Sequence, residues 1–242
     1  MNKAIPINVS LRIKPLSDQE AANDKNHLWV KLSDTSIMNK RTNEVFQYDK
    51  VFSDEASTSD IFDSQIKEIV RAAMHGINQT VFAYGQTSSG KTHTMKGQSG
   101  NSELSRDSMG IIPLSVKEIF KISRMGGEDS DGGMDSKGQG VEREYSISVS
   151  YLEIYNECVN DLIDPANKNL EVRETISSGI CINRLTEKKV TSFEEVMKYM
   201  EQGDEFRNIA ATKLNELSSR SHTVFRISIS SQEKVQGDSS GI

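Results

Sequence analysis

The stretch VFAYGQTSSGKTHTM, residues 81–95, constrains the fold of this chain more than any other. Residues 80–84, TVFAY, are apolar, rich in β-forming residues and too few for a helix, so they predict a buried strand. The next residues, Gly85–Thr92, fit the pattern GxxxxGK[ST], and the residues that follow can open a helix. A strand that runs through a glycine loop into a helix predicts an α/β protein that binds phosphate groups at that loop.

The residue types of this loop suit nucleotide binding. Glycines allow successive backbone N–H groups to converge on a phosphate, and the following helix adds the positive end of its dipole. Lys91 is expected to neutralise β- and γ-phosphate oxygens, and the Thr92 hydroxyl to bind the Mg²⁺ that accompanies the nucleotide. The other phosphate-binding candidates are Gln86, Thr87, Ser88, Ser89 and Gly90.

A chance glycine turn is the alternative interpretation. At average residue usage such a pattern arises by accident in about one chain in a hundred of this length, and the strand and helix context makes accident rarer still. The loop alone leaves kinases, GTPases, transporters and motors open, because a fold and a loop do not determine function.

The rest of the chain alternates strands with helices. Period-two patterns predict strands over residues 5–13, 144–155 and 222–230, with two further short strands joined near Ser178 and Gly179. Helical spacing predicts helices over residues 58–74, 111–123 and 191–203. This alternation predicts one α/β domain over residues 1–242, with helices on both faces of its sheet.

Several residues are candidates to cap these helices. Ser59 or Asp60 is the expected cap of the first helix, and Gly76 lies just past its end. Ser192 and Glu195 have the spacing of a capping box at the start of the last helix.

Composition excludes several classes of protein. The chain is 35% hydrophobic and 26% charged, which is typical of soluble globular domains. It has neither a long apolar run that could span a membrane nor the apolar core of a secretion signal, so a cytoplasmic protein without membrane contact is expected. The net charge of −6 argues against nucleic acid as a partner. Cys158 and Cys181 lack metal-ligand spacing and are expected to be free, buried thiols.

Three segments are rich in Gly, Ser and Asp and poor in large apolar side chains. They are expected to be exposed, flexible loops over residues 97–110 and 125–141 and a polar tail over residues 232–242. The carboxylates of the second loop lack the terminal glutamate of a calcium-binding loop, so an unstructured insertion is the favoured interpretation.

Three motifs together carry a resemblance to a known family. NELSSRSH at 215–222 matches the switch I signature NxxSSRSH of kinesins, YLEIYNECVNDLID at 151–164 is similar to their YxEIYNExxxDLL strand, and AYGQTSSGKTHTM is similar to their phosphate loop. From about residue 7 to 234 the chain resembles the N-terminal two-thirds of a kinesin motor domain, with the centromere-associated and conventional groups both near. The resemblance implies an incomplete kinesin motor fold with a mainly parallel sheet, bound ATP or ADP with Mg²⁺, and a microtubule-stimulated ATPase.

The resemblance also assigns a base site and a switch. RIKP at 12–15 occupies the place of the motif that flanks the adenine, which implicates Arg12, Lys14 and Pro15, with His93 on the other side of the base. Lys14 stands where arginine is usual and lacks a guanidinium's planar stacking, so weaker contact with the base is expected. The switch I residues implied to approach the γ-phosphate and Mg²⁺ are Asn215, Ser218 and Ser219, with Ser219 as the Mg²⁺ ligand.

The sequence departs from the family at its second switch, DxxGxE. DSSG at 238–241 follows a polar stretch rather than an apolar strand and lacks the glutamate, so it is interpreted as coincidence. Arg220 is then expected to lack its usual partner, and hydrolysis by this chain alone to be impaired. The neck and the dimerisation elements are expected to lie outside the chain, and loss of central strands to expose a sheet edge.

The resemblance implies a microtubule partner and a location on microtubules, with the spindle as one such place. The candidate contacts with acidic tubulin are Lys168, Lys188 and Lys189 in the hairpin-like excursion at 168–189, and the alternative is an ordinary solvated face. Two other functions stay open. One is a non-catalytic kinesin-like module that binds nucleotide or a partner, and the other is a small-molecule kinase, which would leave NELSSRSH unexplained.

Overall fold

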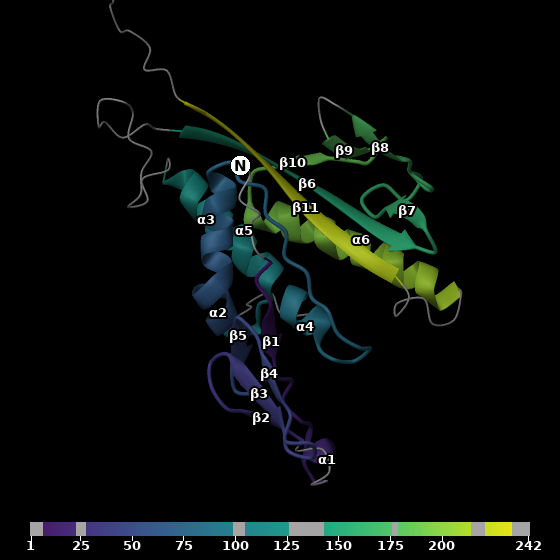
Figure 1. The fold of residues 1–242 in the computed structure, drawn as a ribbon. Coiled ribbons are helices and arrows are strands. Elements are labelled where there is room, and N and C mark those ends of the chain that lie inside the picture. Colours follow the sequence, from purple (N-terminus) through teal and green to yellow (C-terminus); the bar gives the residue numbers. More distant parts are fainter. Residues whose placement is uncertain are drawn as a thin grey trace, which may run out of the picture. The chain divides into compact units, whose positions relative to one another are not determined.

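The computed structural model describes residues 7–22, 28–98, 105–125, 143–175, 179–213 and 221–233 (Figure 1). Its contacts divide the chain into two compact units. One consists of Met1–Ile66 and Phe82–Ile112, and the other of Lys67–Val81 and Pro113–Ile242. Strands and helices occur in both units, which confirms the predicted α/β class. No helix in the described part of the chain is long and apolar enough to cross a membrane.

The first unit is built on short strands. Its elements are β1 (Ser10–Arg12), α1 (Asp18–Ala21), β2 (Trp29–Lys31), β3 (Ser36–Asn39), β4 (Val45–Gln47), β5 (Lys50–Phe52), α2 (Thr58–Ile61), the π-helical turn η2 (Phe62–Ile66), α4 (Lys91–Lys96) and the 3₁₀ turn η3 (Arg106–Ser108). β1 pairs in parallel with β5, with Leu11 opposite Val51, whereas β2, β3 and β4 form an antiparallel meander. A strand was expected over residues 5–13. In the described part of this segment the strand β1 covers three residues, Ser10–Arg12.

The helix predicted over residues 58–74 is present as α2, η2 and α3 (Lys67–Met74), and Gly76 follows it with a left-handed φ of 86°. Its cap is Ser57, not Ser59 or Asp60. The Ser57 hydroxyl accepts a hydrogen bond from the Asp60 amide at 3.1 Å, and the Asp60 carboxylate accepts one from the Ser57 amide at 2.9 Å. This reciprocal capping box satisfies two backbone donors at once.

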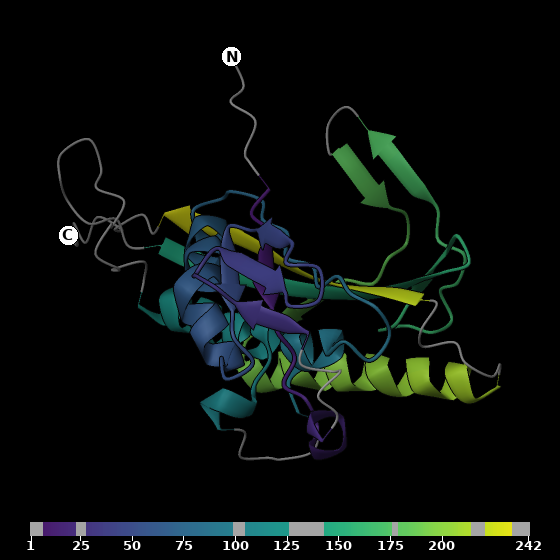
Figure 2. The ribbon, with the colours of Figure 1, turned by 60° about the horizontal axis from the view of Figure 1, so that its bottom comes forward.

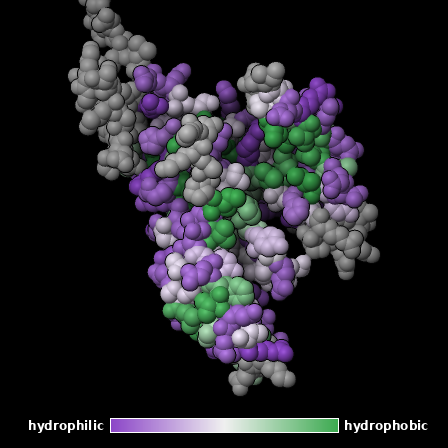
Figure 3. Space-filling view, in the orientation of Figure 1, coloured by the Kyte–Doolittle hydropathy of each residue, from purple (hydrophilic) through white to green (hydrophobic). Residues whose placement is uncertain are grey.

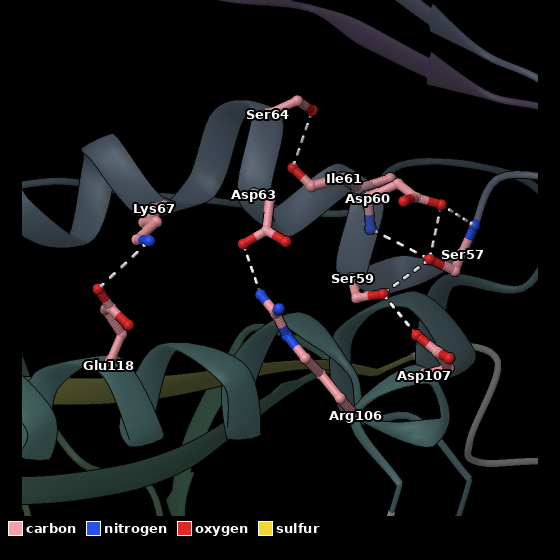
Figure 4. A network of polar contacts seen from close by, with 10 residues as sticks. All are labelled: Ser57, Ser59, Asp60, Ile61, Asp63, Ser64, Lys67, Arg106, Asp107 and Glu118. Atoms are coloured by element: carbon pink, nitrogen blue, oxygen red, sulfur yellow. Dashed lines mark hydrogen bonds and ion pairs between the residues drawn. The ribbon is translucent and has the colours of Figure 1, made fainter.

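The residues around this cap hold η3 in place (Figure 4). The Ser59 hydroxyl donates to the Asp107 carboxylate at 2.7 Å, and Arg106 pairs with Asp63. Ser59 is thus a link between two segments rather than a helix cap.

The second unit is built around one long strand. Its elements are α3, most of α5 (Ile111–Arg124), β6 (Arg143–Tyr155), β7 (Cys158–Asp161), β8 (Val172–Thr175), β9 (Gly179–Ile182), β10 (Lys188–Val190), α6 (Phe193–Lys213) and β11 (Ser221–Glu233). β6 pairs antiparallel with β11, β10 and β7, and β8 and β9 form the predicted hairpin (Figure 2). The strands expected at 144–155 and 222–230 and the helix expected from residue 191 are confirmed, with α6 and β11 both longer than predicted.

α6 packs against strand β6 of this sheet (Figures 1 and 2). Tyr151 of β6 is almost fully buried and lies edge-on to the Phe225 ring, with centroids 5.4 Å apart. Its hydroxyl donates to the Asp204 carboxylate of α6 at 2.7 Å. Burial, followed by the charge of Asp204, raises the pKa of Tyr151 well above its ordinary value, so the phenol stays protonated and keeps its donor.

Gly203 of α6 lies directly against the Tyr151 ring of β6. A Cβ atom at this position would lie 2.4 Å from Cδ1 of Tyr151. Gly203→Ala is expected to destabilise the chain by about 1–3 kcal/mol through overpacking, against a helix-propensity gain of about 1 kcal/mol. Urea unfolding checks this, with Gln202→Ala at the exposed neighbouring position as the control. Equal stability of both variants would show that the Tyr151 ring moves aside freely.

The strand predicted at residues 80–84 is not formed. These residues adopt no regular structure, and Phe82 and Tyr84 are 73% and 95% exposed. A strand exists only when another strand satisfies its backbone N–H and C=O groups, and no described strand pairs with this segment. For the same reason the expectation of a mainly parallel sheet is not met among the described residues. Of the strand pairs in the described part of the chain, only β1–β5 is parallel.

The first of the two predicted loops is partly ordered. Residues 105–110 contain η3, and Met109 is buried and forms a bridge with Gly97. A Cβ atom on Gly110 would lie 2.4 Å from the Met95 carbonyl oxygen, so this backbone packs tightly against the end of α4. Residues 105–107 are exposed, as predicted for this loop, whereas the prediction is wrong for Met109 and Gly110, which are buried. Residues 99–104 and 126–142 lie outside the described part of the chain, as do residues 234–242 of the predicted tail.

Exposed apolar side chains gather on two groups of strands (Figure 3). Val45 and Phe46 of β4 are 49% and 41% exposed, and Phe46 contacts the half-exposed Trp29 ring with centroids 5.8 Å apart. On the β8–β9 hairpin Val172 and Ile180 are 53% and 74% exposed. Exposed apolar surfaces of this kind favour association with other molecules.

Candidate nucleotide site

The glycine loop has a conformation that its sequence dictates. Gly90 has a φ of +93°, in the left-handed region where a residue with a Cβ atom is strained. At the other end of the loop, a Cβ on Gly85 would lie 2.5 Å from the Ser89 hydroxyl. The Ser89 amide donates to the Gln86 carbonyl at 3.2 Å and closes the turn. Glycine is therefore required at position 90 by its backbone conformation, whereas a larger residue at position 85 would displace the Ser89 side chain.

Helix α4 begins at the end of this loop without a side-chain cap. Its N-cap residue is Gly90, and no side chain accepts a hydrogen bond from the first turn. The first amides of a helix lack partners within the helix, so here they are available to an external anion. This donor set suits the phosphates of a nucleotide.

Lys91 bridges the loop. Its ammonium donates to the carbonyl oxygens of Gly85 at 2.8 Å and Gln86 at 2.7 Å. These bonds keep a positive charge beside the loop and the start of α4, where a phosphate would be held. Thr92 follows it in an exposed position, and the loop residues Gln86, Thr87 and Ser88 are exposed too. The lysine and threonine are thus both next to the uncapped helix start.

Arg12 ties the RIKP segment to this helix. Its guanidinium donates to the hydroxyls of Thr58 at 2.9 Å and Thr94 at 3.0 Å, and to the Ala56 carbonyl at 3.2 Å. Burial lowers the pKa of this arginine, although the group remains charged. Thr94 directly follows His93 in α4, so these bonds place Arg12 beside the helix that carries Lys91, Thr92 and His93. The structure therefore shows Arg12 as a link between elements.

The other base-site candidates are exposed. Lys14 lies 3.9 Å from the Glu20 carboxylate, with its side chain 49% exposed, and Pro15 and His93 are also on the surface. No described contact joins Lys14 or Pro15 to α4, so their role toward an adenine base stays a prediction.

The switch I candidates Asn215, Ser218, Ser219 and Arg220 lie outside the described residues. The end of the same motif is described. Ser221 opens β11, and its hydroxyl accepts from Nη2 of Arg207 at 2.9 Å and from Nε of Arg207 at 3.3 Å. The last residue but one of the motif is therefore anchored.

This anchor includes a pair of charges that the sequence did not reveal. Nε of Arg207 also lies 3.2 Å from Oε1 of Glu153, whose side chain is 8% exposed. Glu153 shares its face of β6 with Tyr151, two residues earlier, and Arg207 lies one turn after Gly203 on α6. The sequence did hold one signal for this pair. Glu153 places a carboxylate on the apolar face of a predicted strand, and a buried charge needs a partner.

The three lysines proposed to meet tubulin are all exposed, but they do not form one surface. Lys188 and Lys189 are consecutive residues of β10, opposite Val149 and Ser148 of β6. Consecutive side chains of a strand point to opposite faces. At most one of these two lysines can therefore act together with Lys168 on a flat partner.

Comparisons with known proteins agree with the fold and the loop. A family model described as the kinesin motor domain matches residues 12–241. Kinesin-like protein KIN-7O of Arabidopsis thaliana is 40% identical over 97% of the chain, and Kinesin-related protein 4 of Dictyostelium discoideum is 39% identical over 96% of it. The chain covers 17% and 11% of these two proteins.

Among solved structures, that of a fast kinesin superposes with a TM-score of 0.80 at 35% identity. The match covers 93% of this chain and 60% of the kinesin. A family model that spans nearly the whole chain, with relatives near 40% identity, confirms the resemblance seen in the three motifs. The chain belongs to the kinesin motor domain family.

Proposed function

We propose that this chain is the ATP-binding part of a microtubule-dependent motor. The observation that carries the proposal is the uncapped start of α4 at a left-handed Gly90, with the Lys91 ammonium held across the loop. In this proposal the loop amides and Lys91 hold the phosphates of ATP or ADP, and the hydroxyls of Thr92 and Ser219 hold Mg²⁺. The metal ion supplies charge neutralisation at the β- and γ-phosphates.

Switch I would convert nucleotide state into a change of structure. Asn215, Ser218 and Ser219 would contact the γ-phosphate side of the nucleotide and lose that contact after hydrolysis, as in other order–disorder switches. Arg207 supports this role, because it anchors Ser221 at the end of the motif to Glu153 of β6. The moving part of the switch would then be bounded by a fixed residue.

Hydrolysis by this chain alone is proposed to be weak. The sequence contains no DxxGxE stretch after an apolar strand, and the chain covers 60% of the fast kinesin. Arg220 would have no glutamate partner, and no residue would position the attacking water. An alternative function is a non-catalytic module that holds nucleotide and serves as an interaction surface.

Microtubules are the proposed partner, and the cytoplasmic cytoskeleton the proposed location, with the spindle as one such place. Two of the relatives, KIN-7D of Arabidopsis thaliana and KIN-7E of Oryza sativa subsp. japonica, carry the words mitochondrial and chloroplastic in their names. Location therefore varies among similar proteins. The β8–β9 hairpin and Lys168 are the proposed contact surface within this chain.

ATP turnover with and without microtubules tests the proposal. It is measured on the 242-residue chain and on the reading frame extended past Ile242. We expect microtubule-stimulated turnover from the extended protein and little from the 242-residue chain. Nucleotide binding by both with turnover by neither would contradict the motor and favour the non-catalytic module. Transfer of phosphate to an added small acceptor would instead indicate a kinase.

A further inference from the structure

A cleft of about 430 Å³ lies in the second unit, whereas the glycine loop belongs to the first. Lys117, Phe120, Lys121 and Arg124 of α5 line it, together with Phe193 and Glu194 at the start of α6. Its volume lies in the range of sites that take small ligands or a few side chains of a partner. None of the residues proposed to bind nucleotide contributes to it.

The cleft is strongly basic in a chain whose net charge is −6. Lys117, Lys121 and Arg124 are spaced by four and three residues, so they form one stripe along α5. Within the described part of the chain none of the three forms an ion pair. Glu194 is the one carboxylate among the residues that line the cleft. Hydrogen bonds at the start of α6 and, more weakly, the charges of Arg124 and Lys117 lower the pKa of Glu194. Like charges at this spacing weaken a helix, and an anion between them would offset that cost.

The wall of the cleft is aromatic as well as charged. The Lys117 ammonium lies 5.2 Å from the centre of the Phe193 ring, within cation–π range, and the Phe120 side chain is buried beside it. Lys121 and Arg124 lie in the last turn of α5, where cations complement the helix dipole without any ligand. That explanation does not cover Lys117, which lies near the middle of α5.

We propose that this cleft docks an acidic peptide segment of a partner protein. Its carboxylates would lie against Lys117, Lys121 and Arg124, and one of its aromatic or aliphatic side chains would pack on Phe120 and Phe193. Charge complementarity selects the acidic partner and speeds its encounter, while the apolar wall supplies contact area. The proposal is independent of nucleotide binding, because the two surfaces share no residue.

Fluorescence anisotropy with a short fluorescein-labelled peptide of glutamates around one phenylalanine tests the proposal. On the 242-residue chain we expect binding that weakens with salt and falls about tenfold or more in Lys121→Glu and in Arg124→Glu. Lys40→Glu makes the same charge change at an exposed residue of the first unit and is expected to leave binding unchanged. Circular dichroism confirms that each variant is folded.

Three outcomes would overturn the proposal. Equal losses in Lys40→Glu and Lys121→Glu would indicate general attraction to the chain, and equal binding of a glutamine version of the peptide would show that charge does not select it. Full displacement of the peptide by inorganic tripolyphosphate in the Lys91→Ala chain would indicate a simple anion site. Unchanged peptide binding in that same variant is expected, which separates this surface from the nucleotide loop.

Discussion

Lys91→Ala is expected to lower the affinity of the chain for ATP and ADP by about a hundredfold or more. The ammonium now donates to the carbonyl oxygens of Gly85 and Gln86, which places its charge beside the loop. Charge-assisted hydrogen bonds to phosphate contribute about 1.5–3 kcal/mol each, and about 2.7 kcal/mol corresponds to a hundredfold change in affinity. Titration with a fluorescent ATP analogue in the presence of Mg²⁺ measures the loss.

The matched control is Lys96→Ala, which removes the same charge from the last turn of the same helix. It is expected to bind nucleotide nearly as well as the unchanged chain. Lys91→Ala itself should keep its thermal unfolding midpoint within a few degrees, because its two carbonyl acceptors remain open to water at a loop that is largely exposed. Intact affinity in a folded Lys91→Ala chain would mean that nucleotide binds elsewhere.

Patterns that depend only on neighbouring residues predicted the fold well. The helix at 58–74 and the strand at 144–155 have periodic apolar residues, and the structure has both. The cap of that helix was misplaced by two or three residues, since Ser57, Ser59 and Asp60 are all good cap residues. Which of several adjacent polar residues caps a helix depends on where the backbone leaves the helix, and periodicity does not locate that point.

Residues 80–84 show the limit of local patterns. Their composition is that of a buried strand, yet Tyr84 is 95% exposed and the segment has no partner strand among the described residues. Composition describes what a segment can do, and pairing requires a neighbour from elsewhere in the chain. The same holds for the loop between residues 105 and 110, which is ordered by contacts of Gly97 and Ser59 that no local pattern contains.

The nucleotide site likewise has a part that the sequence predicted and a part that it did not. The glycine loop and Lys91 were predictable, because the chemistry of a phosphate loop lies in contiguous residues. The link from Arg12 to Thr94 and the pair of Arg207 with Glu153 were not, since these partners are far apart in the sequence and meet only in the folded chain. What the sequence missed is therefore the set of supports that hold the predicted residues in place.

Among these supports, the pair of Arg207 and Glu153 gives the largest expected effect on stability. Its two side chains are 18% and 8% exposed, and their atoms lie 3.2 Å apart. Removing one partner of a buried pair costs about 3–5 kcal/mol, because it leaves the other charge without compensation in a poorly solvated place. Arg207→Leu is therefore expected to lower the free energy of unfolding by about 3 kcal/mol, measured by urea denaturation.

A double-mutant cycle separates this pair from general loss of packing. Glu153→Leu alone should also destabilise the chain, whereas Arg207→Leu with Glu153→Leu should recover much of the loss, because no unpaired charge is then buried. Arg173 and Glu171 offer an exposed pair at 2.7 Å for comparison, and Arg173→Leu is expected to change the stability far less than Arg207→Leu, because water screens an exposed pair. Additive losses in the Arg207 and Glu153 variants would show that the two side chains contribute independently. Coupling between them would instead show that their mutual attraction helps to hold α6 against β6.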